Sequence, residues 1–261
     1  MSAIGQLPTA LRRARLIAMA LPPLPEPEAL TVEQGYGLQR QVLRERLEEG
    51  EALSGWKVAF AGALAQARFG LSEPVYGALT SGMQVEPDSR VALVQLVQPK
   101  LEVEVAFLLG RDIPPGSYSD EQLIAAIGEV APAFEIADSR WRDWSFEAGA
   151  FLADNAAAAM YCLGQGQAFE PGRHADVEYR LEHDGMPCGA GSTAGRADAP
   201  LVNLCWLLRR LLADGQPLRA GQVVLSGALL PPLDIRLGEY RLHMLGAELV
   251  LGFDAVSPAN A

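Results

Sequence analysis

Two glutamates interrupt an otherwise apolar segment, PKLEVEVAFLLGRD, at residues 99 to 112. Glu102 and Glu104 are two positions apart, so in a strand both carboxylates point to one face, about 7 Å apart along the backbone. One interpretation places them on the solvent face of an edge strand, where polar and apolar residues ordinarily alternate. The other buries them, and buried carboxylates must be neutralised, paired or bound to a metal ion.

A third carboxylate stands in a second apolar segment, VAPAFEIADSRW, at residues 130 to 141. Glu135 lies there between Phe134 and Ile136, a setting that favours burial. Three carboxylates form an oxygen-only ligand set that suits a hard ion such as Mg²⁺ or Mn²⁺. Such an ion retains waters and leaves positions for a chelating substrate. The sequence therefore predicts a divalent-metal site at Glu102, Glu104 and Glu135.

Lys57 occupies an apolar segment that is expected to be a strand, LSGWKVAF at residues 53 to 60. The side chain could extend outward from a strand end, with its charge in water and its stem on apolar surface. It could instead be a desolvated cation that lies beside an anionic substrate or transfers a proton. Taken alone, the position favours the first interpretation, because lysines are rarely buried.

Other catalytic patterns are weak or missing. The segment GAGSTAG at 189 to 195 has glycines in GxG spacing, but the third glycine comes one residue late and HDG at 183 to 185 predicts a hairpin turn upstream. We therefore expect a flexible loop rather than a phosphate site at 189 to 195. No GxSxG is present, and the histidines are isolated from one another, which disfavours a histidine-centred triad or a His-rich zinc site.

Charge and cysteine content narrow the class of protein. The 261 residues include 32 acidic and 21 basic side chains, a net charge of -11, which disfavours binding to nucleic acid or anionic membranes. The three cysteines are scattered without metal-ligand spacing, as expected of buried thiols in a reducing compartment. No uncharged apolar stretch is long enough to span a membrane. We expect a cytoplasmic protein that acts on small molecules.

The order of elements predicts an α+β fold rather than regular βαβ alternation. Capping boxes at Thr31 and Ser119 and a proline at Pro200 indicate helix starts. We expect one unit over residues 1–261, with a helical N-terminal portion at 1–52 and a strand-rich catalytic portion at 53–261. The expected helices are 31–49, 62–70, 119–128 and 200–213. The expected strands are 53–60, 91–97, 101–109, 130–137, 156–163, 177–183, 222–226, 240–245 and 247–253.

Taken together, these segments resemble the hydratase/decarboxylase family, typified by 2-keto-4-pentenoate hydratase and 4-oxalocrotonate decarboxylase, within the fumarylacetoacetate hydrolase-like fold. The ExE strand followed by a lone glutamate is the specific part of the likeness. The matching segments are GWKVAF (55 to 60), RFGLSEPVYGALTSGM (68 to 83), QPKLEVEVAFLLGRDI (98 to 113), APAFEIADSRWRDW (131 to 144), ADNAAAAMYCLG (153 to 164) and VVLSGALLPPLDI (223 to 235).

The resemblance implies a mixed β-sheet roll with a helical N-terminal portion, in a cytoplasmic homo-oligomer. It also implies roles for the site residues. The three glutamates match metal-binding carboxylates for Mg²⁺ or Mn²⁺, and Lys57 matches a catalytic lysine near the substrate. Ser226 and Gly227 match a pair that we expect at the substrate carboxylate.

The implied activity is metal-dependent hydration of a 2-hydroxy-2,4-dienoate of the 2-keto-4-pentenoate type in aromatic-compound catabolism. Decarboxylation of a 2-oxo-3-enedioate of the 4-oxalocrotonate type is the alternative, and a non-catalytic subunit that partners a decarboxylase or hydratase is another. Many hydratases have an aspartate where this chain has Val75, and relatives commonly place hydroxyl residues where it has VAFAG at 58 to 62. Acylpyruvate hydrolysis is disfavoured, because no histidine and glutamate pair lies near the motifs.

Overall fold

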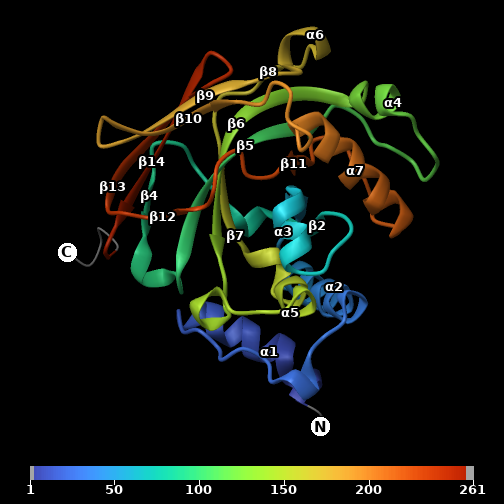
Figure 1. Cartoon of the computed structure of the whole chain (residues 1–261), viewed down its shortest axis with the longest axis vertical. Helices are drawn as coiled ribbons and strands as arrows, with labels where there is room; N and C mark the ends of the chain where they lie inside the picture. The colour runs from blue at the N-terminus through green and yellow to red at the C-terminus, as the bar shows by residue number, and fades with distance from the viewer. Residues whose placement is uncertain (1–2, 257–261) are drawn as a thin grey trace.

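A computed structural model describes residues 3–256 of the chain (Figure 1). Its α-helices are α1 (Ala3–Leu16), α2 (Val32–Glu48), α3 (Ala63–Arg68), α4 (Asp120–Ile124), α5 (Ala148–Ala153), α6 (Pro171–His174) and α7 (Pro200–Ala213). Short 3-10 turns lie at Glu26–Glu28, Ser81–Met83, Leu93–Gln95, Arg142–Trp144 and Asn155–Ala157. None of the described helices is both long and apolar enough to cross a membrane.

The described strands form two sheets. The larger sheet has the order β2-β1-β11-β5-β6-β7-β3, with β12 beside β5 and β8 beside β6. Its strands are β1 (Leu53–Ala59), β2 (Val75–Thr80), β3 (Gln84–Val85), β5 (Pro99–Leu109), β6 (Ile127–Asp138), β7 (Ala158–Leu163), β8 (Gln167–Ala168), β11 (Val223–Leu225) and β12 (Leu233–Asp234). The smaller sheet has the order β10-β9-β13-β14-β4 and contains β4 (Arg90–Ala92), β9 (Glu178–His183), β10 (Met186–Ser192), β13 (Gly238–Met244) and β14 (Ala247–Asp254).

The larger sheet is mixed and strongly curled. β1 runs parallel to β11, whereas β11, β5, β6 and β7 pair antiparallel. Three strand spacings separate β1 from β6, which in a flat sheet would be about 14 Å. The side chains of Lys57 on β1 and Glu135 on β6 nevertheless meet at 2.9 Å. The sheet therefore closes on itself as a roll, and the expected α+β fold with a mixed β-sheet roll is confirmed.

Alternation along β5 sets which side chains enter the roll. Leu101, Val103, Val105 and Phe107 are fully buried in the main core, together with residues of the smaller sheet such as Leu251. The even-numbered residues of β5 face the other way, because successive side chains in a strand point to opposite faces. The glutamates of β5 thus point into the roll, away from the main core. β5 is a central strand, so the solvent-face interpretation of these glutamates is wrong.

Helices α1, α2 and α5 lie together at one end of the molecule (Figure 1). The N-cap of α2 is Thr31, which forms the expected capping box with Gln34. Ser119 forms the same motif with Gln122 at the start of α4. A separate apolar cluster joins this helical end to the rest of the molecule through Leu7, Leu11, Leu30, Trp141, Ala150 and Ala153.

Several sequence expectations are wrong in detail. The strand expected at 91–97 ends at Ala92, and the backbone amides of Val97 and Gln98 donate to the Asp138 carboxylate rather than to a strand. The helix expected at 119–128 ends at Ile124, because β6 begins at Ile127. The segment 189–195 is not simply a loop: its first residues belong to β10, which pairs with β9 through the expected hairpin turn.

The crossing of α2 and α5 generates a stability test. A Cβ on Gly35 would lie 2.3 Å from the carbonyl oxygen of Gly149, whereas a Cβ on Gly37, also in α2, would meet nothing within 4 Å. We expect Gly35→Ala to lower the free energy of unfolding by about 2 kcal/mol, because the two backbones must separate. Gly37→Ala should raise it by up to about 1 kcal/mol through helix propensity. Urea titration measures both, and equal effects would contradict the tight crossing.

Candidate metal and substrate site

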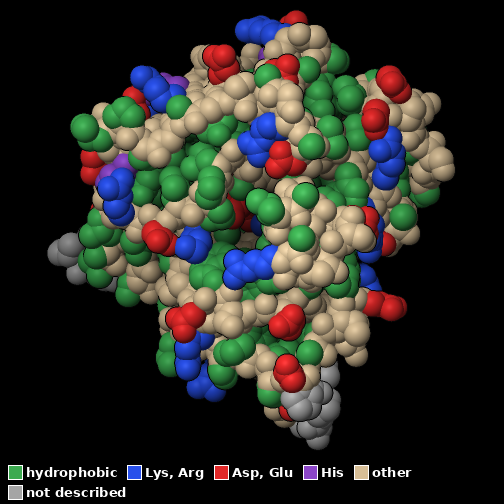
Figure 2. All heavy atoms as spheres, in the orientation of Figure 1, with side chains coloured by type: hydrophobic (Ala, Val, Ile, Leu, Met, Phe, Trp, Pro, Cys, Tyr) green, Lys and Arg blue, Asp and Glu red, His purple; other side chains and the backbone are tan. Residues whose placement is uncertain are grey.

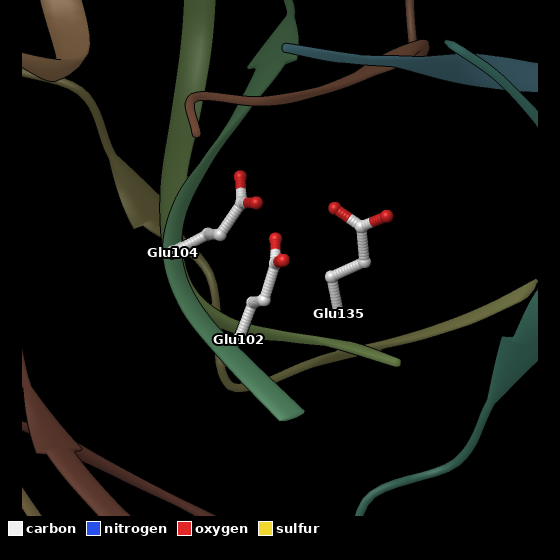
Figure 3. A group of neighbouring side chains, drawn as sticks. All are labelled: Glu102, Glu104 and Glu135. Atoms are coloured by element: carbon white, nitrogen blue, oxygen red, sulfur yellow. The ribbon is translucent and has the colours of Figure 1, made fainter. Parts of the chain in front are cut away.

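The structure brings together the three glutamates that the sequence predicts as metal ligands. Each of Glu102, Glu104 and Glu135 offers a carboxylate oxygen within 4.8 Å of the others, and Figure 3 shows their carboxyl groups gathered in one space. Glu102 is directly opposite Glu135 in the β5–β6 ladder. Glu104 and Glu135 are completely buried, and Glu102 is partly exposed. Like charges placed opposite each other in a sheet are destabilising, so this cluster requires a counter-charge.

The pKa values of Glu102 and Glu104 reflect this repulsion. Burial and the charge of Glu135 raise the pKa of Glu102 to about 7. Burial, Glu135 and Glu102 raise the pKa of Glu104 well above its usual value. Glu135 therefore makes ionisation of Glu102 and Glu104 more difficult, and Glu102 does the same for Glu104. A bound cation would reverse the effect, because it favours the ionised forms.

Hydrogen bonding leaves part of the cluster unsatisfied. Glu104 Oε2 accepts a hydrogen bond of 2.7 Å from the backbone amide of Gly227. Glu104 Oε1 and Glu135 Oε2 are buried and have no hydrogen-bond partner among the described residues. Buried carboxylate oxygens without partners are costly in a folded protein, and metal coordination is one way to satisfy them. The donor set and its unpaired oxygens fit a hard divalent cation.

Lys57 is buried beside the cluster, only 2 % exposed, so its charge does not extend into solvent. Its ammonium nitrogen lies 2.9 Å from Glu135 Oε1 and donates to the carbonyl oxygen of Ala156 at 3.2 Å. Burial lowers the pKa of Lys57, but the charges of Glu135, Glu102 and Glu104 raise it more, and the net shift is upward. Lys57 therefore carries a proton in this arrangement and is held in a fixed position.

A left-handed turn, not expected from the sequence, supplies the carbonyl that holds Lys57. Asn155, Ala156 and Ala157 have φ angles of 53°, 51° and 59°, a conformation that residues other than glycine rarely adopt. The side chain of Asn155 anchors the turn to β2, because Oδ1 accepts from the amide of Ala78 and Nδ2 donates to its carbonyl, both at 2.8 Å. Asn155 thereby positions the Ala156 carbonyl for Lys57.

Of the two residues expected at the substrate carboxylate, Gly227 contacts the cluster and lines the cavity described below, whereas Ser226 does not line it. Ser226 is completely buried, and its hydroxyl has no hydrogen-bond partner among the described residues. Gly227 has a φ of 95°, which favours glycine, and its amide is already bonded to Glu104. Asn203 donates to the Ser226 carbonyl at 2.7 Å and holds this segment in place.

A cavity of about 700 Å³ opens over Lys57 and Glu102. Figure 2 shows a hollow on this face, with acidic atoms visible inside it and basic side chains around it. Residues 58 to 62, where relatives commonly place hydroxyl residues, form part of the wall. Val75 instead packs in the main core and does not line the cavity. None of the three histidines lines it.

Aromatic and basic side chains of the wall were not identified from the sequence. Phe60, Phe69, Phe146 and Phe151 stack in a closed ring, with centroids 4.4 to 5.5 Å apart, and we call this group the phenylalanine wall. The basic residues of the wall are Arg68, Lys100 and Arg196. One signal was available: the chain contains only two lysines, Lys57 and Lys100, and both line this cavity.

Curated relatives identify the family. The 2-hydroxyhexa-2,4-dienoate hydratase of Comamonas testosteroni is 34 % identical over 88 % of this chain and 87 % of its own length. The 2-keto-4-pentenoate hydratase of Paraburkholderia xenovorans is 32 % identical over 83 % of this chain and 81 % of its own length. A 4-oxalocrotonate decarboxylase of a Pseudomonas species is 31 % identical over 90 % of this chain and 91 % of its own length.

The chain belongs to this hydratase/decarboxylase family. No protein-family model matches it. Its relatives are hydro-lyases and a decarboxylase, so the expected enzyme class, lyase, is confirmed.

Solved structures confirm the fumarylacetoacetate hydrolase-like fold of this family member. A 4-oxalocrotonate decarboxylase from Pseudomonas putida G7, complexed with magnesium and adipate, superimposes with a TM-score of 0.89 at 22 % identity, over 96 % of this chain and 97 % of that one. A fumarylpyruvate hydrolase from Pseudomonas aeruginosa, in complex with Mn²⁺ and pyruvate, gives a TM-score of 0.57 at 14 % identity, over 77 % of this chain and 89 % of that one.

The Asn155 clamp leads to a second stability test. Asn155→Ala removes both hydrogen bonds to Ala78 and leaves a Cβ-bearing residue in the left-handed region, so we expect a loss of about 2 to 4 kcal/mol. Asn155→Gly removes the same bonds but adopts this φ readily, and should be more stable than Asn155→Ala by about 1 kcal/mol. Urea unfolding of the two variants separates the clamp from the backbone strain. Wild-type stability in both variants would exclude the clamp.

Proposed function

We propose that this family member is a divalent-metal-dependent hydratase that adds water to a 2-hydroxy-2,4-dienoate in aromatic-compound catabolism. The observation that carries the proposal is the meeting of three carboxylates and a buried lysine beside one cavity. The names of several relatives at 32 to 34 % identity support the choice of hydration. We propose that residues 1–261 act as one functional unit in a cytoplasmic homo-oligomer.

We propose that Glu102, Glu104 and Glu135 hold Mg²⁺ or Mn²⁺. Their oxygen-only character and the unpaired oxygens of Glu104 and Glu135 support this assignment. When bound, such an ion supplies positive charge beside the acid end of a 2-oxo or 2-hydroxy acid. Gly227 lines the cavity, and the Ser226 hydroxyl beside it has no partner among the described residues, so we place the substrate carboxylate next to this pair.

Lys57 is the residue of this chain best placed to move a proton. Ketonisation of a 2-hydroxy-2,4-dienoate transfers a proton from oxygen to carbon, and water then adds to the conjugated carbon that has become electrophilic. Lys57 Nζ carries a proton at the cavity wall and is hydrogen-bonded to fixed partners on either side. During ketonisation it can give this proton to carbon and regain one from the 2-hydroxyl group, which leaves the lysine charged before water adds. The surrounding carboxylates stabilise its charged form between these steps.

Decarboxylation of a 2-oxo-3-enedioate is the second candidate function. The 31 % identity to a 4-oxalocrotonate decarboxylase supports it over most of both chains. The carboxylate cluster and Lys57, which form the floor of the cavity, do not discriminate between the two reactions, because both pass through an enolate of a 2-oxo acid.

A third alternative is a subunit without catalysis of its own, which associates with a decarboxylase or hydratase. Turnover and product identity with the purified protein separate these possibilities.

Metal binding should depend on pH. Because the pKa of Glu102 is about 7 in the metal-free fold, above its value of about 4.3 in an unfolded chain, this group favours folding at low pH and loses that contribution as pH rises through 7. Mg²⁺ requires the ionised carboxylate, so its affinity should be at least about tenfold weaker at pH 6 than at pH 8. The Mg²⁺-induced rise in melting temperature, measured at both pH values, tests this.

Two variants control that measurement. Glu102→Gln should largely abolish the Mg²⁺-induced stabilisation and raise metal-free stability at pH 8, because it removes one charge from the cluster. Glu129→Gln, an exposed position on the same strand as Glu135, should respond to Mg²⁺ as the wild type does. Equal Mg²⁺ responses in the two variants would exclude Glu102 as a ligand.

Lys57→Met should lower kcat for hydration of 2-hydroxypenta-2,4-dienoate by about 10²-fold or more, because the variant loses proton transfer. NMR analysis of the product distinguishes added water from released carbon dioxide. Unchanged kinetics in a folded Lys57→Met protein would remove the lysine from the mechanism. Release of carbon dioxide from a 2-oxo-enedioate, without hydration of the dienoate, would make the enzyme a decarboxylase.

A further inference from the structure

The basic rim of the cavity contrasts with the acidity of the chain as a whole. The protein has a net charge of -11, yet Arg68, Lys100 and Arg196 all line this one opening. The proposed function already places one substrate carboxylate beside Gly227, at the inner end of the cavity. Asp198 also lines the cavity and pairs with Arg196, so the rim charge that a ligand can use comes from Arg68 and Lys100, and it indicates further negative charge on the ligand.

The three cations are not equally available to a ligand. Arg196 is fully engaged, because it binds both carboxylate oxygens of Asp198 at 2.9 and 3.0 Å and the Leu229 carbonyl at 2.6 Å. Arg68 is exposed and forms no ion pair among the described residues; its guanidinium lies 5.5 Å from the ring centroid of Phe69. Arg68 can thus bind an anion without first breaking an existing ion pair.

Lys100 is aligned with the metal-ligand candidates. It precedes Glu102 by two residues on β5, so its side chain points to the same face, about 7 Å further along the strand. This spacing is comparable with the length of an extended six-carbon acid. Lys100 pairs with Asp234 at 2.5 Å, but the Asp234 side chain is 90 % exposed, and exposed ion pairs are weak. The ring of Trp144, 5.8 Å away, also holds the ammonium group.

The wall between the two ends suits a flat, conjugated chain. The phenylalanine wall lines the same cavity through Phe60, Phe69, Phe146 and Phe151, and aromatic surface favours planar unsaturated carbon over water. A ligand that is chelated near Glu102 and extends toward Lys100 would pass this surface. The cavity therefore offers an acid-binding floor, an apolar middle and a cationic rim.

We propose that Lys100 and Arg68 bind a second carboxylate at the distal end of the substrate, so that the enzyme prefers dicarboxylic 2-hydroxy-dienoates or 2-oxo-enoates. This inference rests on the proposed function for the position of the substrate's acid end. It adds the chemical class of the tail. A plain hydrocarbon tail would leave both cations without a role at the cavity.

A matched pair of unreactive ligands tests the proposal. In 2-oxohexanoate and 2-oxohexanedioate the carbon chains are equal, and only the terminal methyl group is replaced by a carboxylate. Calorimetric titration of the Mg²⁺-loaded protein should give at least about tenfold tighter binding of 2-oxohexanedioate, as expected for charge-assisted hydrogen bonds. Equal affinities for the two ligands would overturn the proposal.

Variants assign the preference to residues. Arg68→Gln and Lys100→Gln should each reduce the affinity ratio of the two ligands several-fold, and together bring it close to one. Asp234→Asn should raise the ratio, because it removes the competing carboxylate. Arg173→Gln removes an exposed cation that does not line the cavity, and should leave the ratio unchanged. A purely structural role for Arg68 or Lys100 would weaken both ligands alike and preserve the ratio, which would contradict the proposal.

Lysine NMR signals report directly on the distal site, and dienoate turnover reports separately on the proposed function. With only two lysines in the chain, a protein labelled at lysine side chains gives two lysine NMR signals, and the Lys100 signal should shift with the dicarboxylate but not with 2-oxohexanoate. If dienoates are hydrated but the affinity ratio is one, the proposed function stands and this inference fails. If no dienoate is turned over but the ratio responds to Arg68→Gln, the distal site stands and the proposed function fails.

Discussion

Repulsion among three buried carboxylates is the constraint on which the rest of the structure depends. Glu102 and Glu135 face each other across neighbouring strands, and Glu104 lies on the same face. The protein supplies only part of the necessary counter-charge, through the ammonium group of Lys57 and the amide of Gly227. A single lysine cannot neutralise three carboxylates. The raised pKa values of Glu102 and Glu104 mean that these two groups ionise readily only beside a further cation, which is the physical reason to expect a divalent ion, independent of any family resemblance.

The curled sheet makes this arrangement possible. In the strand order, β11 and β5 separate the strand of Lys57 from that of Glu135, so only a roll brings the two side chains into contact. The inner face of the roll beside the glutamates carries small side chains, such as Ala106, Ala131 and Ala133, which leave room for charged groups. The opposite face of β5 is anchored in the main core by valines and Phe107. Charge inside the roll thus depends on apolar packing outside it.

Local patterns in the sequence were sufficient for part of this site and not for the rest. The shared face of Glu102 and Glu104 follows from strand alternation alone, and the caps of α2 and α4 follow from residue spacing. The burial of Lys57 could not be predicted this way, because its partner lies on a strand distant in the sequence. The turn at Asn155 has only a weak local signal: asparagine tolerates left-handed backbone, but the alanines that follow gave no reason to expect it. Its conformation is imposed by hydrogen bonds to β2.

The cavity separates the common chemistry of the family from the selection of its substrate. The floor, made of the carboxylate cluster and Lys57, can stabilise an enolate whichever bond then forms or breaks. The wall has a different origin: Phe60 and Arg68 flank or belong to α3, whereas Phe146 and Phe151 come from the segment around α5. These connecting segments can vary without disturbing the sheet that holds the floor. Differences in substrate among relatives should therefore be found in α3, in the segment before α5 and at the outer end of β5, where Lys100 lies on the same strand as two residues of the floor.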